Sequence, residues 1–249
     1  AAGPNRNRFL AGSGLLLIGM VIPVVPAIAV YGYLLRVMRG SMRGDLRELP
    51  AWDTWGELFI EGLKAFAVAI VYLLPGLLAM FAGFMAYIVA GPVSMTLLQA
   101  QRRPDPESLG GFMLVLFGGM ALMFIGLSVG FFLSLLGTIP LPVALARLAD
   151  SGNLGDAFHL RAIWRLIRQR GWAYIAAWVV VMGLFGFAYL GYTLIYFTWI
   201  LCAVAMFFIA PATFYVLTIG AVTFGRFYAQ RNAAPSVVGA PEPSGDPAI

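Results

Sequence analysis

Four long stretches of this sequence contain no charged residue, and they constrain the fold more than any other feature. The stretches lack Asp, Glu, Lys, Arg and His and comprise residues 9–35, 65–100, 110–146 and 172–225. An apolar run of about 18 or more residues is long enough to cross a bilayer as a helix. The composition agrees, since 61% of the residues are hydrophobic and 11% are charged, against roughly 45–50% and 25% in soluble domains. The sequence therefore predicts an all-α polytopic membrane protein.

The lengths of these stretches predict six transmembrane helices. Residues 65–100 would measure about 54 Å as one helix at about 1.5 Å per residue, whereas a hydrocarbon core is about 30 Å thick. They either cross twice with a turn near Gly83 or form one steep span whose end projects outward. Residues 172–225 are long enough for two spans with a turn near residues 186–191, and residues 9–35 for one.

The positive charges favour five spans instead. Five spans would place both polar linkers and the C-terminal tail on one side, with twelve of the sixteen Lys and Arg residues there. That asymmetry is the one expected from the positive-inside rule. Six spans leave nine cations on one side and seven on the other. Six spans are the expectation, and five are the alternative.

Prolines interrupt the predicted spans. A proline removes a backbone hydrogen bond and kinks a helix, and in a membrane neighbouring groups must satisfy the freed carbonyls. Pro23 and Pro26 lie in the first stretch, Pro75 and Pro92 lie in the second, and the sequence GTIPLP at residues 137–142 lies in the third. We therefore expect these helices to be broken or kinked.

The segment ELPAWDTWGELFIEGLKA, residues 48–65, has the pattern of a helix at a membrane surface. Thr54 followed by Glu57 matches a capping box, which predicts a helix start. Apolar residues share one helix face and charged residues the other; the two sets are Trp55, Leu58, Phe59, Gly62 and Phe66, and Glu57, Glu61 and Lys64. We expect residues 54–64 to lie in the interface, with Trp52 and Trp55 toward lipid or the bundle and Glu57 and Glu61 toward water.

A second amphipathic interfacial helix is predicted in GDAFHLRAIWRLIRQRGW, residues 155–172. Its apolar residues recur at helical spacing, with arginines on the opposite side and Asp156 as the expected cap. The apolar set is Leu160, Ile163, Trp164 and Ile167, and the basic set is Arg161, Arg165 and Arg168. We expect the arginines to lie near the phosphates of lipid headgroups.

The order of features indicates an internal duplication. A span with prolines, a polar linker, an amphipathic helix and a long apolar segment occur in this order in residues 9–101 and again in residues 110–228. We expect a short N-terminal segment (residues 1–8), one helical membrane domain (residues 9–231) and a disordered tail rich in Pro, Ala, Gly and Ser (residues 232–249). Because the first residue is Ala1, we also expect the native start to have been trimmed or processed.

Several blocks of the sequence resemble one known family. The blocks VYGYLLRVMRG, ELPAWDTWGELFIEGLKA, VYLLPG and PVALARLADSGNLGDAF are similar to a family of prokaryotic integral membrane proteins, domain of unknown function 4013. The likeness covers nearly the whole chain, and the Gly-Tyr…Arg…Arg and Leu-Pro-x-Trp-Asp-x-Trp blocks are fairly specific to it. Members usually carry a longer N-terminal lead. The resemblance implies a multi-pass protein of a prokaryotic cell membrane, and it implies no activity, substrate or catalytic residue.

No pattern in the sequence predicts catalysis, a cofactor or a metal site, and we expect the protein not to be an enzyme. The only histidine, His159, lies in the arginine-rich segment, and the only cysteine, Cys202, lies in an apolar stretch. The carboxylates of residues 45–61 are scattered around an exposed helix face rather than clustered for a cation. Ion-coupled transport ordinarily needs charged residues inside the membrane, although carbonyls freed at the helix breaks leave sodium coordination open. The cations lie between spans, which favours lipid headgroups over nucleic acid as partners.

Glycine is the last informative feature. The chain has 29 glycines, and Gly126 and Gly130 form a small-xxx-small pair that favours close helix packing. Two functions are consistent with these features. The first is a noncatalytic structural or accessory subunit that packs against lipids and other membrane proteins. The alternative is a transporter or channel for a neutral or lipidic solute.

Overall fold

The computed structural model describes residues 3–19, 24–45, 48–99, 106–197 and 202–230. In these residues the chain forms helices and no strand, which confirms the all-α class. The helices are α1 (Gly3–Gly19), α2 (Val24–Arg43), α3 (Trp55–Gln99), α4 (Pro106–Thr138), α5 (Leu141–Ser151), α6 (Leu154–Ala157), α7 (Leu160–Phe197) and α8 (Cys202–Ala229).

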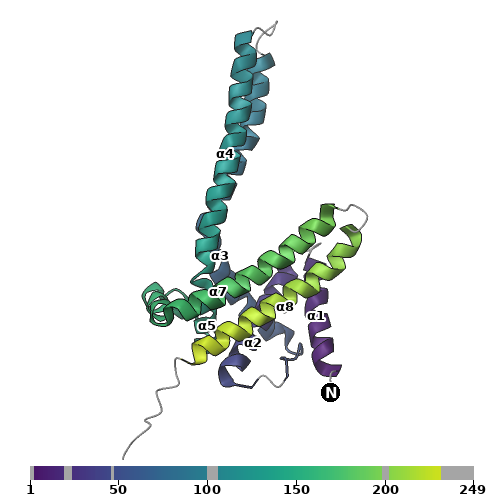
Figure 1. Cartoon of the computed structure of the whole chain (residues 1–249), viewed down its shortest axis with the longest axis vertical. Coiled ribbons are helices and arrows are strands. Elements are labelled where there is room, and N and C mark those ends of the chain that lie inside the picture. The colour runs from purple at the N-terminus through teal and green to yellow at the C-terminus, as the bar shows by residue number, and fades with distance from the viewer. Residues whose placement is uncertain (1–2, 20–23, 46–47, 100–105, 198–201, 231–249) are drawn as a thin grey trace, which may run out of the picture.

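The dominant feature is a long hairpin of α3 and α4, which projects from a bundle of the other helices (Figure 1). Helix α3 is a single helix of 45 residues that continues through Pro75 and Pro92. Of the two alternatives for residues 65–100, the structure has the single helix, and the turn near Gly83 is wrong. Gly83 is instead pressed against α4, where an added Cβ would lie 2.8 Å from the Cα of Gly126.

Small residues hold the two helices of the hairpin in contact along their length. Gly76 faces the backbone of Gly130, and Gly119 faces Ala90. An added Cβ at Gly126 would lie 2.6 Å from the Cα of Gly83 and 2.9 Å from a carbonyl oxygen of α3, and at Gly130 it would lie 2.6 Å from the carbonyl oxygen of Gly76. The predicted packing residues Gly126 and Gly130 both lie in this seam, the line of contact between α3 and α4.

The first apolar stretch does not form one span. The structure describes two antiparallel helices there, α1 and α2. At one end of the pair, the ring nitrogen of Trp52 donates to the carbonyl of Arg8 at 3.0 Å while the Trp52 ring stacks on Tyr33 with centroids 4.1 Å apart. At the other end, an added Cβ at Gly19 would lie 3.6 Å from Pro26. The expectation of a single helix over residues 9–35 is therefore wrong, and the prolines there disfavour an unbroken helix.

The predicted break at residues 137–142 is present, because α4 ends at Thr138 and α5 begins at Leu141. The turn expected near residues 186–191 is wrong, since α7 continues to Phe197. Glycine is more frequent in membrane helices than in soluble ones, so Gly186 and Gly191 do not by themselves require a turn. Helix α7 instead bends at Gly171, where φ is 38°. It then runs antiparallel to α8, with Tyr174 near Phe224 and Val181 near Gly220.

Four helices of the described chain are long and apolar enough to cross a membrane. They comprise Trp55–Gln99, Leu109–Thr138, Gly171–Gly191 and Phe208–Ala229. Six spans, or five, are therefore not confirmed. Residues 54–64 do not form a separate surface helix, because α3 begins at Trp55 and continues without interruption into its apolar part. The predicted disordered tail at residues 232–249 lies outside the described residues, and the duplication of residues 9–101 and 110–228 stays a prediction.

The seam predicts a strong dependence of stability on glycine position. Gly126→Leu places a side chain against the backbone of α3, which has no room to yield, so we expect a loss of about 1–3 kcal/mol or more in the free energy of unfolding. Gly118→Leu on the same helix is the matched control, because an added Cβ there meets nothing within 4 Å. Thermal unfolding in detergent, followed by circular dichroism, compares the two. Equal melting temperatures for both variants would refute the assigned seam.

Candidate functional site

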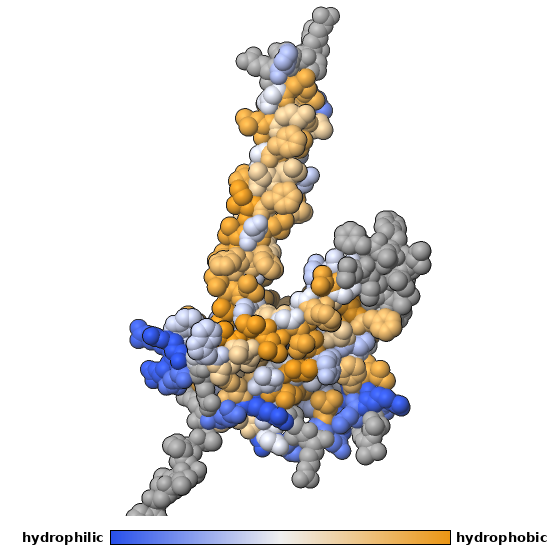
Figure 2. All heavy atoms as spheres, viewed as in Figure 1, coloured by the Kyte–Doolittle hydropathy of each residue, from blue (hydrophilic) through white to orange (hydrophobic). Residues whose placement is uncertain are grey.

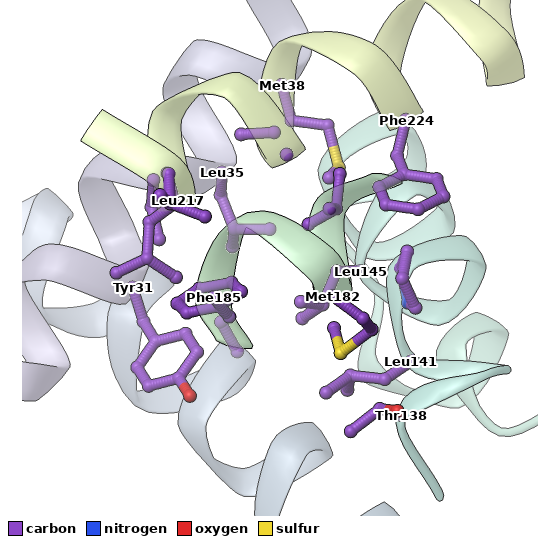
Figure 3. A pocket seen from close by; sticks show the side chains of 17 residues that line it. Tyr31, Leu35, Met38, Thr138, Leu141, Leu145, Met182, Phe185, Leu217 and Phe224 are labelled. Atoms are coloured by element: carbon purple, nitrogen blue, oxygen red, sulfur yellow. The ribbon is translucent and has the colours of Figure 1, made fainter. Parts of the chain in front are cut away.

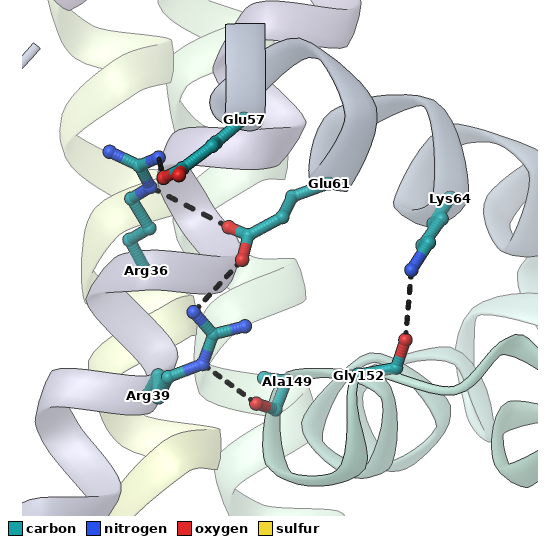
Figure 4. Close-up of polar contacts among 7 residues, drawn as sticks. All are labelled: Arg36, Arg39, Glu57, Glu61, Lys64, Ala149 and Gly152. Carbon is teal, nitrogen blue, oxygen red and sulfur yellow. Dashed lines mark hydrogen bonds and ion pairs between the residues drawn. The ribbon is translucent and has the colours of Figure 1, made fainter. Parts of the chain in front are cut away.

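The charged residues around the start of α3 form one network with α2 and α5 (Figure 4). The network depends on a close contact between two antiparallel helices, because an added Cβ at Gly32 or Gly62 would overlap the backbone of the facing helix. This contact brings the arginines of α2 opposite the carboxylates of α3. The charged residues of both helices are visible in the sequence. Their pairing, however, cannot be predicted without knowing that the two helices are antiparallel.

Glu61 is the centre of the network. Its carboxylate lies 3.0 Å from Nη1 of Arg39 and 3.5 Å from Nε of Arg36. Glu57 pairs with Arg36 at 3.5 Å, but its side chain is 78% exposed, against 26% for Glu61. The expectation that Glu61 faces water is therefore wrong. The physical reason is that α2 covers this face of α3 and supplies two guanidinium groups.

The same network binds the C-terminal end of α5. Arg39 donates from Nε to the carbonyl of Ala149 at 2.9 Å, and Lys64 donates to the carbonyl of Gly152 at 3.0 Å. The last carbonyls of a helix lack intrahelical partners and carry partial negative charge, so cations stabilise them. The network therefore fixes α5 against α2 and α3.

Trp52 and Trp55 lie in an aromatic cluster next to this network. The ring of Trp52 contacts Tyr33, Trp55 and Phe214. Trp55 is 51% exposed, whereas Tyr33 is completely buried. The Tyr33 hydroxyl has no hydrogen-bond partner among the described residues. Trp52 thus serves to pack the linker onto the bundle; its position relative to lipid stays a prediction.

The arginine-rich segment forms the first part of α7. Ile163, Leu166 and Ile167 are buried against the bundle. The predicted basic residues Arg161, Arg165 and Arg168 are exposed, and so are two of the predicted apolar residues, Leu160 (61%) and Trp164 (54%). The buried face is therefore narrower than the sequence predicts, and lipid contact stays a prediction.

The polar residues before α7 differ from the expectation in one respect. Asp156 does not cap the arginine-rich helix. It lies in α6, whose first turn is capped by Asn153 through a 3.1 Å hydrogen bond from the amide of Gly155. His159 is mostly exposed and lies 3.8 Å from Asp156. In the part of the chain that the structure describes, no group of three or more His, Cys, Asp or Glu residues is arranged to hold a metal ion.

An apolar pocket lies beside the network, and sequence reasoning missed it (Figure 3). It has a volume of about 160 Å³, is partly open and is lined by residues of five long helices and of α5. Its side chains are almost all apolar, including Leu35, Met38, Leu217 and Phe224. The hydroxyl of Thr138 is occupied by the carbonyl of Leu135 at 2.6 Å. On α2 and α8 the lining residues recur at helical spacing, a pattern that in a sequence is indistinguishable from an ordinary core face.

These features define an all-helical protein with four helices able to span a membrane, a polar network at the base of a long hairpin and an apolar pocket next to it. The chain belongs to the DUF4013 family of proteins of unknown function, whose family model matches residues 15–197. No curated protein and no solved structure matches the chain.

The network predicts that its two carboxylates differ in importance. Glu61→Ala leaves Arg36 and Arg39 without their shared partner, and we expect it to lower the free energy of unfolding by about 1–3 kcal/mol. Glu57→Ala, which removes one exposed pair, should cost less than about 0.5 kcal/mol. Thermal unfolding in detergent measures both. A Glu57 variant as unstable as the Glu61 variant would contradict the assigned centre.

Proposed function

We propose that this protein is a noncatalytic accessory or structural subunit of a prokaryotic cell membrane, which packs against lipids and another membrane protein. It would need no cofactor, and nucleic acid is not among the proposed partners. The observation that carries the proposal is the length and the outward-facing surface of the α3–α4 hairpin. Figure 2 shows that apolar residues cover this face of the hairpin, whereas most hydrophilic residues gather along the lower side of the bundle.

The apolar part of the hairpin is longer than a bilayer is thick. From Ala65 to Leu98, α3 contains only uncharged residues, and this part measures about 50 Å at about 1.5 Å per residue. The hydrocarbon core of a bilayer is about 30 Å thick. A helix tilted by about 40°, the upper end of the usual range, has about 39 Å of its length inside that core. About 10 Å of apolar α3 therefore needs another cover, which the bundle provides in part at Ala65, Val68 and Ala69.

The far end of the hairpin has the side chains that such a cover would contact. The seam uses small residues, so the large side chains of both helices face outward. Leu114 is 75% exposed, Val89 is 59% exposed and Phe117 is 55% exposed. A contiguous apolar surface of this kind is typical of a protein interface when lipid cannot reach it. This supports a membrane-protein partner at the far end and lipid contact nearer the bundle.

The positive charges support one orientation. Of the sixteen Lys and Arg residues, two precede the first apolar stretch, five lie in residues 36–64, five in residues 147–170 and two in residues 226–231. With α1 and α2 antiparallel, all these segments belong to the same side of the membrane, and the remaining two cations, at positions 102 and 103, belong to the other. The positive-inside rule makes the first side cytoplasmic.

The α1–α2 pair fits this arrangement as a hairpin of partial depth. Its uncharged parts, residues 9–19 and 24–35, have eleven and twelve residues. Runs of about 10–14 apolar residues are typical of re-entrant or interfacial segments rather than of full spans. The proposed topology is therefore four crossings and one re-entrant hairpin, with the exposed arginines of α7 at the cytoplasmic headgroups.

A second function, a transporter or channel for a neutral or lipidic solute, is favoured by one observation. The pocket of about 160 Å³ lies between helices and is lined by apolar side chains. A carrier would need this pocket to open alternately toward two sides, whereas a subunit would keep it occupied.

The proposed topology predicts which positions a reagent outside the membrane can reach. In a Cys202→Ser background, Asp53→Cys and His159→Cys should react with a membrane-impermeant maleimide only in inverted vesicles, because both linkers are placed in the cytoplasm. Gln99→Cys, at the far end of α3, should react only in intact cells. Reaction of positions 53 and 159 from opposite sides would refute the arrangement.

The proposed partner surface predicts position-dependent cross-linking. A benzophenone amino acid in place of Leu114 should form a discrete adduct with one membrane protein in native membranes. Phe131, on the same helix and 65% exposed, is the control, since it lies about 25 Å nearer the bundle at about 1.5 Å per residue and should cross-link to lipid. If both positions give only lipid adducts, the accessory-subunit proposal fails and the carrier becomes the better candidate.

A further inference from the structure

We infer that the groove between α2, α5 and α8 binds one phospholipid whose headgroup carries both a phosphate and a primary ammonium. One acyl chain would occupy the apolar pocket, and the headgroup would occupy a second cavity next to it. This inference rests on the proposed location in a membrane, and it names the lipid that the bundle would retain.

The two cavities lie one after the other along α2 and α8. The second cavity has a volume of about 140 Å³ and is lined by Arg39, Met42, Arg43, Asp150, Tyr228 and Ala229. Helices α2 and α8 run parallel, because Ser41 donates to the carbonyl of Val222 at 2.7 Å and Tyr33 contacts Phe214. Along α2 the pocket ends at Met38 and the second cavity includes Met42, one helical turn further. Along α8 the corresponding pair is Phe224 and Tyr228.

The second cavity contains separated charges of opposite sign. Arg43 and Asp150 both line it, and neither forms an ion pair with any residue that the structure describes. Arg39 is occupied by Glu61 and by the carbonyl of Ala149. An unpaired guanidinium is suited to a phosphate, whereas an unpaired carboxylate is suited to an ammonium group.

The C-terminal helix ends around the second cavity favour a zwitterionic headgroup over an anionic one. Helices α2, α5 and α8 end at Arg43, Ser151 and Ala229, so three C-terminal ends lie around this cavity. The C-terminal end of a helix carries partial negative charge and favours a cation. Together with Asp150, these ends oppose a headgroup with only negative charge. A phosphate near Arg43 with an ammonium group near Asp150 matches both charges.

The apolar pocket has the size and lining for part of an acyl chain. An apolar cavity of about 150 Å³ takes a ligand the size of benzene, so a pocket of about 160 Å³ holds several methylene groups while the rest of the chain remains in the bilayer. Transfer of an acyl chain from lipid to this pocket removes no apolar surface from water. The choice among lipids must therefore come from the headgroup cavity.

The test uses the full chain, reconstituted in nanodiscs with equal amounts of phosphatidylethanolamine, phosphatidylglycerol and phosphatidylcholine, and then released for native mass spectrometry. We expect phosphatidylethanolamine to be retained at least about threefold more than either of the others, an effect in the range of one exposed ion pair. Phosphatidylcholine tests the ammonium contact, because its quaternary nitrogen has no proton to donate. Equal retention of the three lipids, or preference for phosphatidylglycerol, would overturn the inference.

Variants test the headgroup cavity and the acyl-chain pocket separately. Asp150→Asn should abolish the preference for phosphatidylethanolamine over phosphatidylcholine, and Arg43→Gln should lower the retention of all three lipids. Gly220→Leu should exclude the acyl chain, since an added Cβ there meets only Val181 at 3.4 Å and the new side chain fills the pocket. Gly183→Leu is its matched control, because Gly183 lies outside the pocket and has open space around it.

An unchanged preference in Asp150→Asn, or equal retention in the Gly220 and Gly183 variants, would refute the assigned site. These measurements need no protein partner. Their failure would therefore leave cross-linking at Leu114 unaffected, and failure of that cross-linking would leave the lipid preference unaffected.

Discussion

Close contact between helix backbones, made at glycine, determines the shape of this protein. α2 and α3 meet at Gly32 and Gly62, α3 and α4 meet at Gly83 and Gly126, and α8 meets α2 at Gly225. At each place an added Cβ would overlap backbone atoms of the facing helix, which cannot move aside as the end of a side chain can. In lipid no hydrophobic transfer drives helices together, so association depends on close van der Waals packing. These glycine positions therefore set the register of α2 with α3, of α3 with α4 and of α2 with α8.

Two consequences follow from these contacts. The contact of α2 with α3 places two arginines opposite Glu61 and so forms the network that binds the end of α5. The seam of α3 with α4 uses small residues, so large side chains such as Phe131 and Leu114 face outward. A soluble protein has the reverse arrangement, with large apolar side chains in its core. The outward surface thus follows from the same packing that stabilises the hairpin, and it is a surface that only lipid or another protein can cover.

Local features were predictable from the sequence, and features that depend on a facing helix were not. The start of α3 after Thr54 and the break after Thr138 follow from capping and proline chemistry, and both are present. The supposed turn at Gly83 is wrong because glycine in a membrane helix signals either a turn or a contact, and only the position of α4 distinguishes them. The partial burial of Glu61 and the existence of the pocket depend in the same way on neighbours far along the chain. The positions of Gly126 and Gly130 in the seam agree with their spacing, which is a local signal.

The conflict between span lengths and charge had its origin in residues 65–100. Counted as two crossings, this stretch and the one crossing of residues 110–146 put the two polar linkers on opposite sides, whereas α3 as one crossing puts them on the same side. Two antiparallel helices return the chain to the side on which it started, whether they cross the bilayer fully or only to half its depth. In the proposed topology α1 and α2 together therefore contribute an even number of crossings. Both polar linkers then lie on the same side of the membrane as the N-terminal segment. Length and charge therefore agree once residues 65–100 cross once, and in the proposed topology the α1–α2 hairpin makes the charge asymmetry stronger than in the five-span alternative, with fourteen of the sixteen cations on one side.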